Sequence, residues 1–200
     1  MKNKKEHAII TAPNIISFFR LVLSPFFLYF ILAGKTREAF LIFIIAISTD
    51  FFDGAVARIF NQKSNLGALL DPIGDKILMT VSYVALSIPS LNTPNVIPLW
   101  LTLAVIGRDI YIVLGALAAF KTLGRKNFPP TFSGKTSTVF QMAVPLVVLF
   151  FNLIQLETAY LYLLFVLTLV TTLISGIHYT YIGIKWIHQS KSRAQNTSLE

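Results

Sequence analysis

The chain has no cysteine among its 200 residues, and it has few charged residues. Without thiols it forms no disulfide and no thiolate metal site, so any bound metal must take oxygen or imidazole ligands. Charged residues make up 13% of the chain and hydrophobic residues 54%, a balance that excludes an ordinary soluble domain. The composition therefore indicates an integral membrane protein.

The sequence contains several long apolar runs. A membrane-spanning helix needs about 20 apolar residues. Six stretches reach that length, at about 14–33, 38–60, 73–92, 96–120, 137–155 and 159–187. We therefore predict an all-α polytopic membrane protein with six transmembrane helices. Residues 1–200 are expected to form a single domain with polar cytoplasmic tails at about 1–12 and 188–200.

The net charge of +8 is distributed unevenly over the connecting segments. With the N-terminus in the cytoplasm, Lys35 and Arg37 fall outside, whereas twelve basic residues fall on the cytoplasmic side. This is the positive-inside bias of membrane proteins, and it favours contact with anionic membrane lipids over nucleic acid. Arg20, Lys76 and Arg108 lie inside apolar stretches and need a functional explanation.

Acidic residues are scarce but concentrated. Four of the nine lie within residues 50–75: Asp50, Asp53, Asp71 and Asp75. A charge at bilayer depth costs from a few to more than about ten kcal/mol, so this cluster needs strong compensation. The two pairs are three and four residues apart, so on two helices each pair faces one way. Carboxylates suit hard divalent cations, and two such ions can assist a displacement at phosphorus.

Small and basic residues accompany the aspartates. Gly54, Ala57 and Gly67 leave room for a bulky ligand, or for close helix packing, and Arg58 offers a forked donor to phosphate oxygens. A structural ion-pair network is one alternative, although too few basic groups are near. A cation or proton transporter is another, although such sites usually accompany inverted repeats, which this sequence lacks.

The pattern resembles a known signature. Asp50-x-x-Asp53-Gly54-x-x-Ala57-Arg58, eight residues, then Gly67-x-x-x-Asp71-x-x-x-Asp75 is similar to the complete motif of the CDP-alcohol phosphotransferases. Members of that family transfer a phosphatidyl group from a cytidine-diphosphate lipid to an alcohol and release CMP. The resemblance implies the CDP-alcohol phosphotransferase fold, a homodimer, and a cytoplasm-facing site in a bacterial inner or plasma membrane.

The resemblance also implies roles for individual residues. Two Mg²⁺ or Mn²⁺ ions would be held by Asp50, Asp53, Asp71 and Asp75. Asp75 would in addition be the catalytic general base that takes the proton of the acceptor hydroxyl. The donor CDP-diacylglycerol would be bound by Gly54, Ala57, Arg58 and Gly67.

An anionic acceptor would need further basic groups, and the candidates for its phosphate are Arg20, Arg108 and Lys135. Residues 13–20 and 172–183 resemble phosphatidylglycerophosphate synthases, whereas Arg108-Asp109 and residues 129–141 are closer to eukaryotic-type cardiolipin synthases, with Ser137 where the former have a second lysine. We favour sn-glycerol 3-phosphate as acceptor, with phosphatidylglycerol as the alternative.

Three further expectations concern the second half of the chain. Residues 121–137 are expected to be non-helical and to face the substrate, because they contain paired prolines and two glycines. A pairing of Arg108 with Asp109 is disfavoured, since adjacent helical residues point about 100° apart. His178 is expected to be a packing residue and not a ligand.

Overall fold

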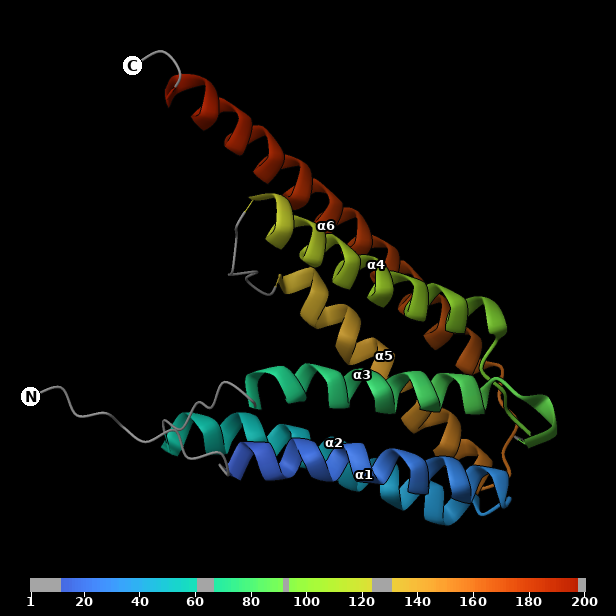
Figure 1. The fold of residues 1–200 in the computed structure, drawn as a ribbon. Helices are drawn as coiled ribbons and strands as arrows, with labels where there is room; N and C mark the ends of the chain where they lie inside the picture. The colour runs from blue at the N-terminus through green and yellow to red at the C-terminus, as the bar shows by residue number, and fades with distance from the viewer. Residues whose placement is uncertain (1–11, 61–66, 92–93, 124–130, 198–200) are drawn as a thin grey trace, which may run out of the picture. The chain divides into compact units, whose positions relative to one another are not determined.

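The computed structural model describes the backbone of residues 12–60, 67–91, 94–123 and 131–197, and the side chains of residues 19–49, 74, 76–91, 94–119 and 131–186. Within these ranges the chain is helical and contains no strand (Figure 1). The elements are α1 (Ala12–Leu32), α2 (Thr36–Phe60), α3 (Gly67–Leu86), the short 3-10 helix η1 (Pro89–Leu91), α4 (Leu99–Leu123), α5 (Phe132–Leu153) and α6 (Tyr160–Thr197). The predicted all-α fold is confirmed.

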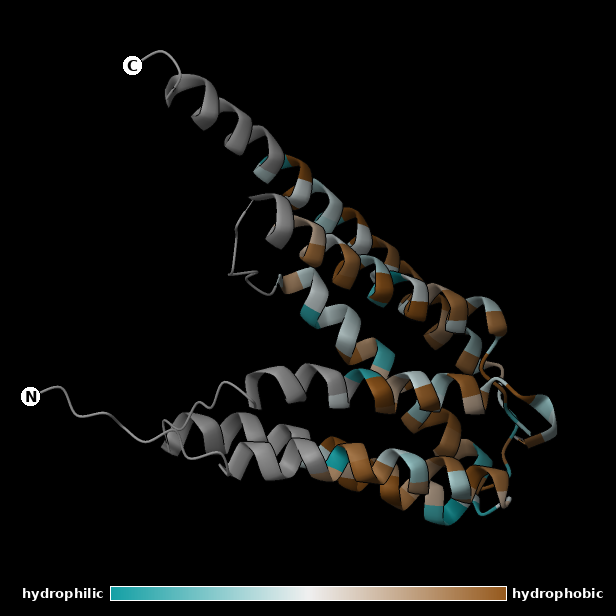
Figure 2. Cartoon of the chain, viewed as in Figure 1, coloured by the Kyte–Doolittle hydropathy of each residue, from teal (hydrophilic) through white to brown (hydrophobic). Residues whose placement is uncertain are grey.

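Three helices are long and apolar enough, over their described residues, to cross a membrane. These segments are Leu99–Ala119, Phe132–Leu153 and Tyr160–Trp186. Shorter apolar segments, Phe19–Leu32 and Lys76–Leu86, lie in α1 and α3. Figure 2 shows that hydrophobic positions dominate the described lengths of the helices, with few hydrophilic ones between them. The structure thus supports a membrane protein, and a full set of six spans stays a prediction.

Some helix boundaries differ from those expected. α5 begins at Phe132, so residues 132–137 are helical and the expectation of a non-helical segment through 137 is wrong. The helix starts here because the Thr131 Oγ1 accepts a hydrogen bond from the Gly134 backbone N–H at 3.1 Å, which caps the N-terminal end. At the other end of the chain, α6 continues to Thr197, beyond the apolar run that ends near 187.

The chain divides into two compact units. One comprises Met1–Ile97 and Pro145–Thr158, and the other comprises Pro98–Val144 and Ala159–Glu200. The division falls within α5 at Pro145, whose ring nitrogen has no hydrogen to donate to the preceding turn. That all 200 residues behave as one domain stays a prediction.

In the first unit, α1 packs against both α2 and α3. The buried positions of α1 are Arg20, Ser24, Phe27 and Ile31, which repeat every three or four residues and so share one face of the helix. Phe27 meets Phe43 of α2 with ring centroids 5.7 Å apart. This packing places the C-terminal end of α2 and the N-terminal end of α3 at the end of the unit where α1 begins (Figure 1).

The turn between α1 and α2 is built on Gly34. Its φ is +67°, a left-handed conformation, and the Lys35 N–H donates to the Phe30 carbonyl at 2.8 Å across it. Glycine adopts this conformation without the steric cost of a side chain, so Gly34 ends α1 cleanly. The reversal lets α2 run back beside α1.

A second connection in this unit is held by two asparagines. The Asn152 Oδ1 accepts hydrogen bonds from the backbone N–H and the Nδ2 of Asn95 at 2.8 and 2.9 Å, and the Asn152 Nδ2 donates to the Asn95 carbonyl at 2.8 Å. The Asn95 Nδ2 also donates to the carbonyl of Leu156 at 2.9 Å. The segment just before α4 is thereby joined to the C-terminal end of α5.

In the second unit, α4 packs against α6. The buried face of α6 starts apolar at Leu161 and Phe165 and becomes polar at Thr168, Thr172 and Ser175. The Gln141 Nε2 of α5 donates to the Thr172 Oγ1 at 3.2 Å, so part of this polar stripe joins α5 to α6. The unit therefore carries hydrogen-bonding groups inside an otherwise apolar bundle.

Candidate functional site

The predicted metal and donor residues fall on two helices of the first unit. Asp50, Asp53, Gly54, Ala57 and Arg58 are on α2, and Gly67, Asp71 and Asp75 are on α3. The helical spacing that the prediction requires is therefore present in both segments. The side chains of these eight residues lie outside the described residues, so their metal-binding and donor-binding roles stay predictions. Among the side chains that are described, no group of three or more His, Asp or Glu residues forms a metal site.

Arg20 lies on the buried face of α1 and is 2% exposed. Snorkelling of this side chain to the aqueous surface, which its position near the helix start would permit, is not observed. α1 and α2 run antiparallel from the turn at Gly34, and both rise about 1.5 Å per residue, so Arg20 is level with Ser48 of α2. Arg20 is thus buried at the height where the acidic segment of α2 begins.

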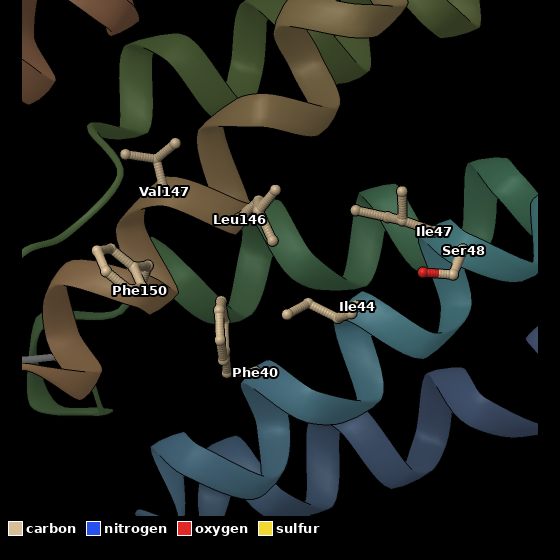
Figure 3. A pocket seen from close by; sticks show the side chains of 7 residues that line it. All are labelled: Phe40, Ile44, Ile47, Ser48, Leu146, Val147 and Phe150. Atoms are coloured by element: carbon tan, nitrogen blue, oxygen red, sulfur yellow. The ribbon is translucent and has the colours of Figure 1, made fainter. Parts of the chain in front are cut away.

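A cavity of about 470 Å³ opens between α2 and the part of α5 in the same unit (Figure 3). It is lined by Phe40, Ile44, Ile47, Ser48, Leu146, Val147 and Phe150. Phe40 and Phe150 face each other with centroids 6.1 Å apart. The lining contains one hydroxyl group, that of Ser48, and six apolar side chains. Such a lining suits a hydrocarbon group, because a nucleotide or a free phosphate would find few polar partners in it. The described lining of this cavity therefore favours an apolar group over a nucleotide.

Arg108 lies inside the second unit, on α4, and its side chain is 9% exposed. Its Nη1 donates to the Asp109 Oδ1 at 2.8 Å, and its Nη2 donates to the Ser175 Oγ of α6. The Arg108–Asp109 pairing, disfavoured from sequence because the residues are adjacent, is therefore made: the long arginine side chain reaches back to its neighbour. The buried Nε has no hydrogen-bond partner among the described residues.

The Arg108 guanidinium also faces the ring of Tyr179 on α6, 5.8 Å from its centroid. A cation over an aromatic face contributes about 0.5–2 kcal/mol, more when water is excluded. Arg108 is thus held by a carboxylate, a hydroxyl and a ring, while its Nε has no hydrogen-bond partner among the described residues. A buried donor without a partner is costly, so an additional acceptor such as a phosphate oxygen would stabilise this arrangement.

Lys135 lies in the first turn of α5 in the same unit and is exposed. The neighbouring Gly134 is buried against Tyr179: a Cβ at this position would lie 2.9 Å from the Tyr179 Oη. Next to it, the Ser133 Oγ is hydrogen-bonded to the His178 Nδ1 at 2.7 Å. The start of α5 is therefore fixed against the segment of α6 that also contacts Arg108.

Of the three predicted acceptor-phosphate residues, Arg108 and Lys135 belong to the second unit and Arg20 to the first. Ser137, the position of the absent second lysine, is fully buried and is hydrogen-bonded by the Gln141 Nε2 at 3.2 Å. In this chain residue 137 therefore packs inside the helix bundle.

Ser175 and Tyr179 are not among the site residues predicted from the sequence, and His178 is predicted there only as a packing residue. A sequence pattern that could have indicated Ser175 and Tyr179 is a polar stripe along α6. It consists of residues spaced three or four apart: Thr168, Thr172, Ser175 and Tyr179. Such a stripe within an apolar helix indicates a face turned to other polar groups.

Comparison with known proteins decides the family. The sequence profile of the CDP-alcohol phosphatidyltransferases matches residues 10–174, which include all the predicted site residues. The chain belongs to this family. The resemblance seen in the acidic motif is confirmed.

Relatives of this chain carry two names. The chain is 33% identical over 202 residues to the cardiolipin synthase (CMP-forming) of Rattus norvegicus, covering 92% of this chain and 65% of the rat protein. It is 32% identical over 181 residues to the CDP-diacylglycerol–glycerol-3-phosphate 3-phosphatidyltransferase of Aquifex aeolicus, covering 89% of this chain and 98% of that protein. The enzyme of the second name from Salmonella paratyphi A is 35% identical over 167 residues, which are 80% of this chain and 87% of that one. The chain thus spans slightly less than two thirds of the rat relative.

Proposed function

We propose that this protein transfers the phosphatidyl group of CDP-diacylglycerol to sn-glycerol 3-phosphate, giving phosphatidylglycerophosphate and CMP. The family membership and the names of the Aquifex and Salmonella relatives support the reaction type. The observation that carries the choice of acceptor is Arg108, a buried cation with an unused Nε donor on the unit that also contains Lys135. A phosphate monoester supplies the negative charge and the acceptor oxygens that such a group needs.

The donor set of the acidic motif fits divalent cations. Four carboxylates on α2 and α3 offer hard oxygen ligands, which suit Mg²⁺ or Mn²⁺, and no softer ligand is present in the motif. Two such ions, held by Asp50, Asp53, Asp71 and Asp75, would neutralise charge on the phosphates. Phosphoryl transfer depends chiefly on positioning and charge neutralisation, so little further chemistry is asked of the protein.

The protein's own chemical step is assigned to Asp75. Its carboxylate takes the proton from the acceptor hydroxyl as the oxygen attacks the β-phosphorus of the donor, and CMP leaves with the electron pair of the broken P–O bond. Gly54, Ala57 and Gly67 give the nucleotide room, and Arg58 binds the donor phosphates. The site faces the cytoplasm of a bacterial inner membrane, and the protein acts as a homodimer.

Cardiolipin synthesis from phosphatidylglycerol is the second candidate, because the rat relative has that name and because Arg108 is followed by Asp109 here. Phosphatidylglycerol has a phosphodiester with a single negative charge, whereas glycerol 3-phosphate is close to a dianion. The doubly charged acceptor is the better match for two basic residues. Family membership argues against a transporter.

The deciding experiment is CMP release by the purified protein in detergent, with CDP-diacylglycerol, Mg²⁺ or Mn²⁺, and each acceptor in a separate reaction. We expect metal-dependent release with glycerol 3-phosphate alone. Release with phosphatidylglycerol alone would establish the cardiolipin synthase instead. No release with either acceptor would overturn both assignments.

A further inference from the structure

Tyr179 is placed between the two basic residues that the proposed function assigns to the acceptor phosphate. One side of its ring faces the Arg108 guanidinium at 5.8 Å. Its hydroxyl end abuts Gly134, the residue before Lys135, closely enough that an added Cβ would lie 2.9 Å from Oη and 3.2 Å from Cε2. One rigid side chain thus contacts the arginine of α4 and the first turn of α5.

Arg108 has little freedom beside that ring. Its Nη1 and Nη2 are engaged by Asp109 and Ser175, and the ring of Tyr179 covers the guanidinium. The Nε remains without a partner among the described residues, so the other contacts determine the direction in which that donor points. The planar group is oriented before any ligand arrives, which lowers the entropy lost on binding.

We propose that Tyr179 is a positioning residue of the acceptor site: its ring holds the Arg108 guanidinium, and its contact with Gly134 fixes the start of α5, so that Arg108 and Lys135 are presented together to the acceptor's phosphate. The proposal rests on the proposed function, in which both cations bind that phosphate. It assigns to α6 a role in acceptor selection that the acidic motif of α2 and α3 does not contain.

The aromatic ring of Tyr179, and not its hydroxyl group, is expected to hold Arg108 in position. Tyr179→Phe retains the aromatic face and is expected to keep the acceptor KM within about twofold of wild type. Tyr179→Leu removes the face and is expected to raise the acceptor KM about 3- to 30-fold, the equivalent of one cation–π contact. The KM for CDP-diacylglycerol is expected to stay within about twofold in both variants, because the donor is bound by residues of α2 and α3.

Gly134→Ala tests the same contact from the opposite side without altering Tyr179. The added methyl group displaces the ring, so the acceptor KM is again expected to rise. In a Tyr179→Leu background the same substitution is expected to add a smaller increase, since the clash with the tyrosine is gone and only the Thr131 Oγ1, 3.0 Å from the added Cβ, still crowds it. This variant also covers the case in which Tyr179→Leu fails to fold.

Tyr111 provides the matched control. It is an exposed tyrosine of α4 that is hydrogen-bonded to the Thr180 Oγ1 of α6 at 2.8 Å, so it joins the same two helices through a different contact. Tyr111→Leu is expected to leave the KM of both substrates unchanged. An equal rise in acceptor KM in this variant would overturn the proposal, because the effect would then come from general loosening of α4 and α6.

Arg108→Ala separates failure of the inference from failure of the proposed function. We expect this variant to raise the acceptor KM, and the double variant with Tyr179→Leu to raise it by less than the product of the two single effects, because the contact of the ring with Arg108 is already lost. If Arg108→Ala raises the acceptor KM and both Tyr179→Leu and Gly134→Ala leave it unchanged, the positioning role is wrong and the acceptor site stands. If Arg108→Ala itself leaves the acceptor KM unchanged, the acceptor site of the proposed function is wrong, and the role of Tyr179 falls with it.

Discussion

At the scale of single residues, the chemistry divides between the two units. The carboxylates of the family motif are on α2 and α3, with Arg20 buried on the helix between them, whereas Arg108 and Lys135 belong to the second unit. Arginine buried in an apolar bundle is expensive unless it is paired. Contacts with Asp109, Ser175 and Tyr179 offset this cost for Arg108, and its Nε has no hydrogen-bond partner among the described residues.

Asp75 is the residue whose predicted role is most sharply testable. Asp75→Asn removes the proton acceptor, so we expect kcat for CMP release to fall by a factor of about 10²–10⁴. Mn²⁺ binding, measured separately by calorimetry, is expected to be weakened but not lost, because three carboxylates remain and an amide oxygen is still a ligand.

Glu38→Gln is a suitable control for this variant, since Glu38 is an exposed carboxylate in the first turn of α2. It is expected to leave turnover and Mn²⁺ binding unchanged. Wild-type turnover in Asp75→Asn would remove Asp75 from the role of base.

At the scale of elements, the packing of the helices follows the apolar and polar residues along their buried faces, and their lengths follow the hydrogen bonds at their ends. The buried face of α6 passes from Leu161 and Phe165 to Thr168, Thr172 and Ser175, so one helix supplies apolar packing at its start and polar contacts further along. The ends are set by local hydrogen bonds: Thr131 caps the start of α5, and Gly34 ends α1 in a left-handed turn. These devices explain why α5 begins inside a segment expected to be non-helical.

The asparagine pair between residues 94–97 and the end of α5 gives a prediction at this scale. Asn152→Ala leaves buried polar groups of Asn95 without partners, so it is expected to lower the free energy of unfolding by about 1–3 kcal/mol. Thermal unfolding in detergent measures this as a lower transition temperature.

Glu157→Ala changes an exposed residue of the same region and is expected to leave the transition temperature unchanged. A transition temperature for Asn152→Ala equal to that of wild type would show that water replaces the lost hydrogen bonds.

At the scale of the whole molecule, the orientation in the membrane follows from charge. Lys35, in the turn between α1 and α2, is expected outside, and Lys185, far along α6, is expected in the cytoplasm. Both side chains are exposed, and the chain has no cysteine, so the wild-type protein already serves as the cysteine-free background for labelling.

Lys35→Cys and Lys185→Cys therefore test the orientation directly. In intact spheroplasts, a membrane-impermeant maleimide is expected to label the first variant and to label the second only after permeabilisation. The reverse pattern would place the acidic ends of α2 and α3 outside the cytoplasm and would exclude a cytoplasmic active site.

The sequence alone determined the class, the family and the helices. Apolar runs and the i, i+3 and i, i+4 spacing of the aspartates are local properties of the sequence. They can be recognised without knowledge of the fold. Within the described residues each of the six long helices overlaps one of those runs, although α3 begins and ends about six residues earlier than predicted and α6 continues about ten residues further. The roles of Asp50, Asp53, Asp71 and Asp75 rest on that motif.

The tertiary structure alone decided which polar residues meet. Arg108 and Ser175 are 67 positions apart in the chain, and Asn95 and Asn152 are 57 apart, so no local pattern pairs them. The contact of Tyr179 with Arg108 and Gly134 depends on α4, α5 and α6 packing together within one unit. Side-chain partners separated by such distances are selected by helix packing, because burial leaves each polar group only the neighbours that the fold supplies.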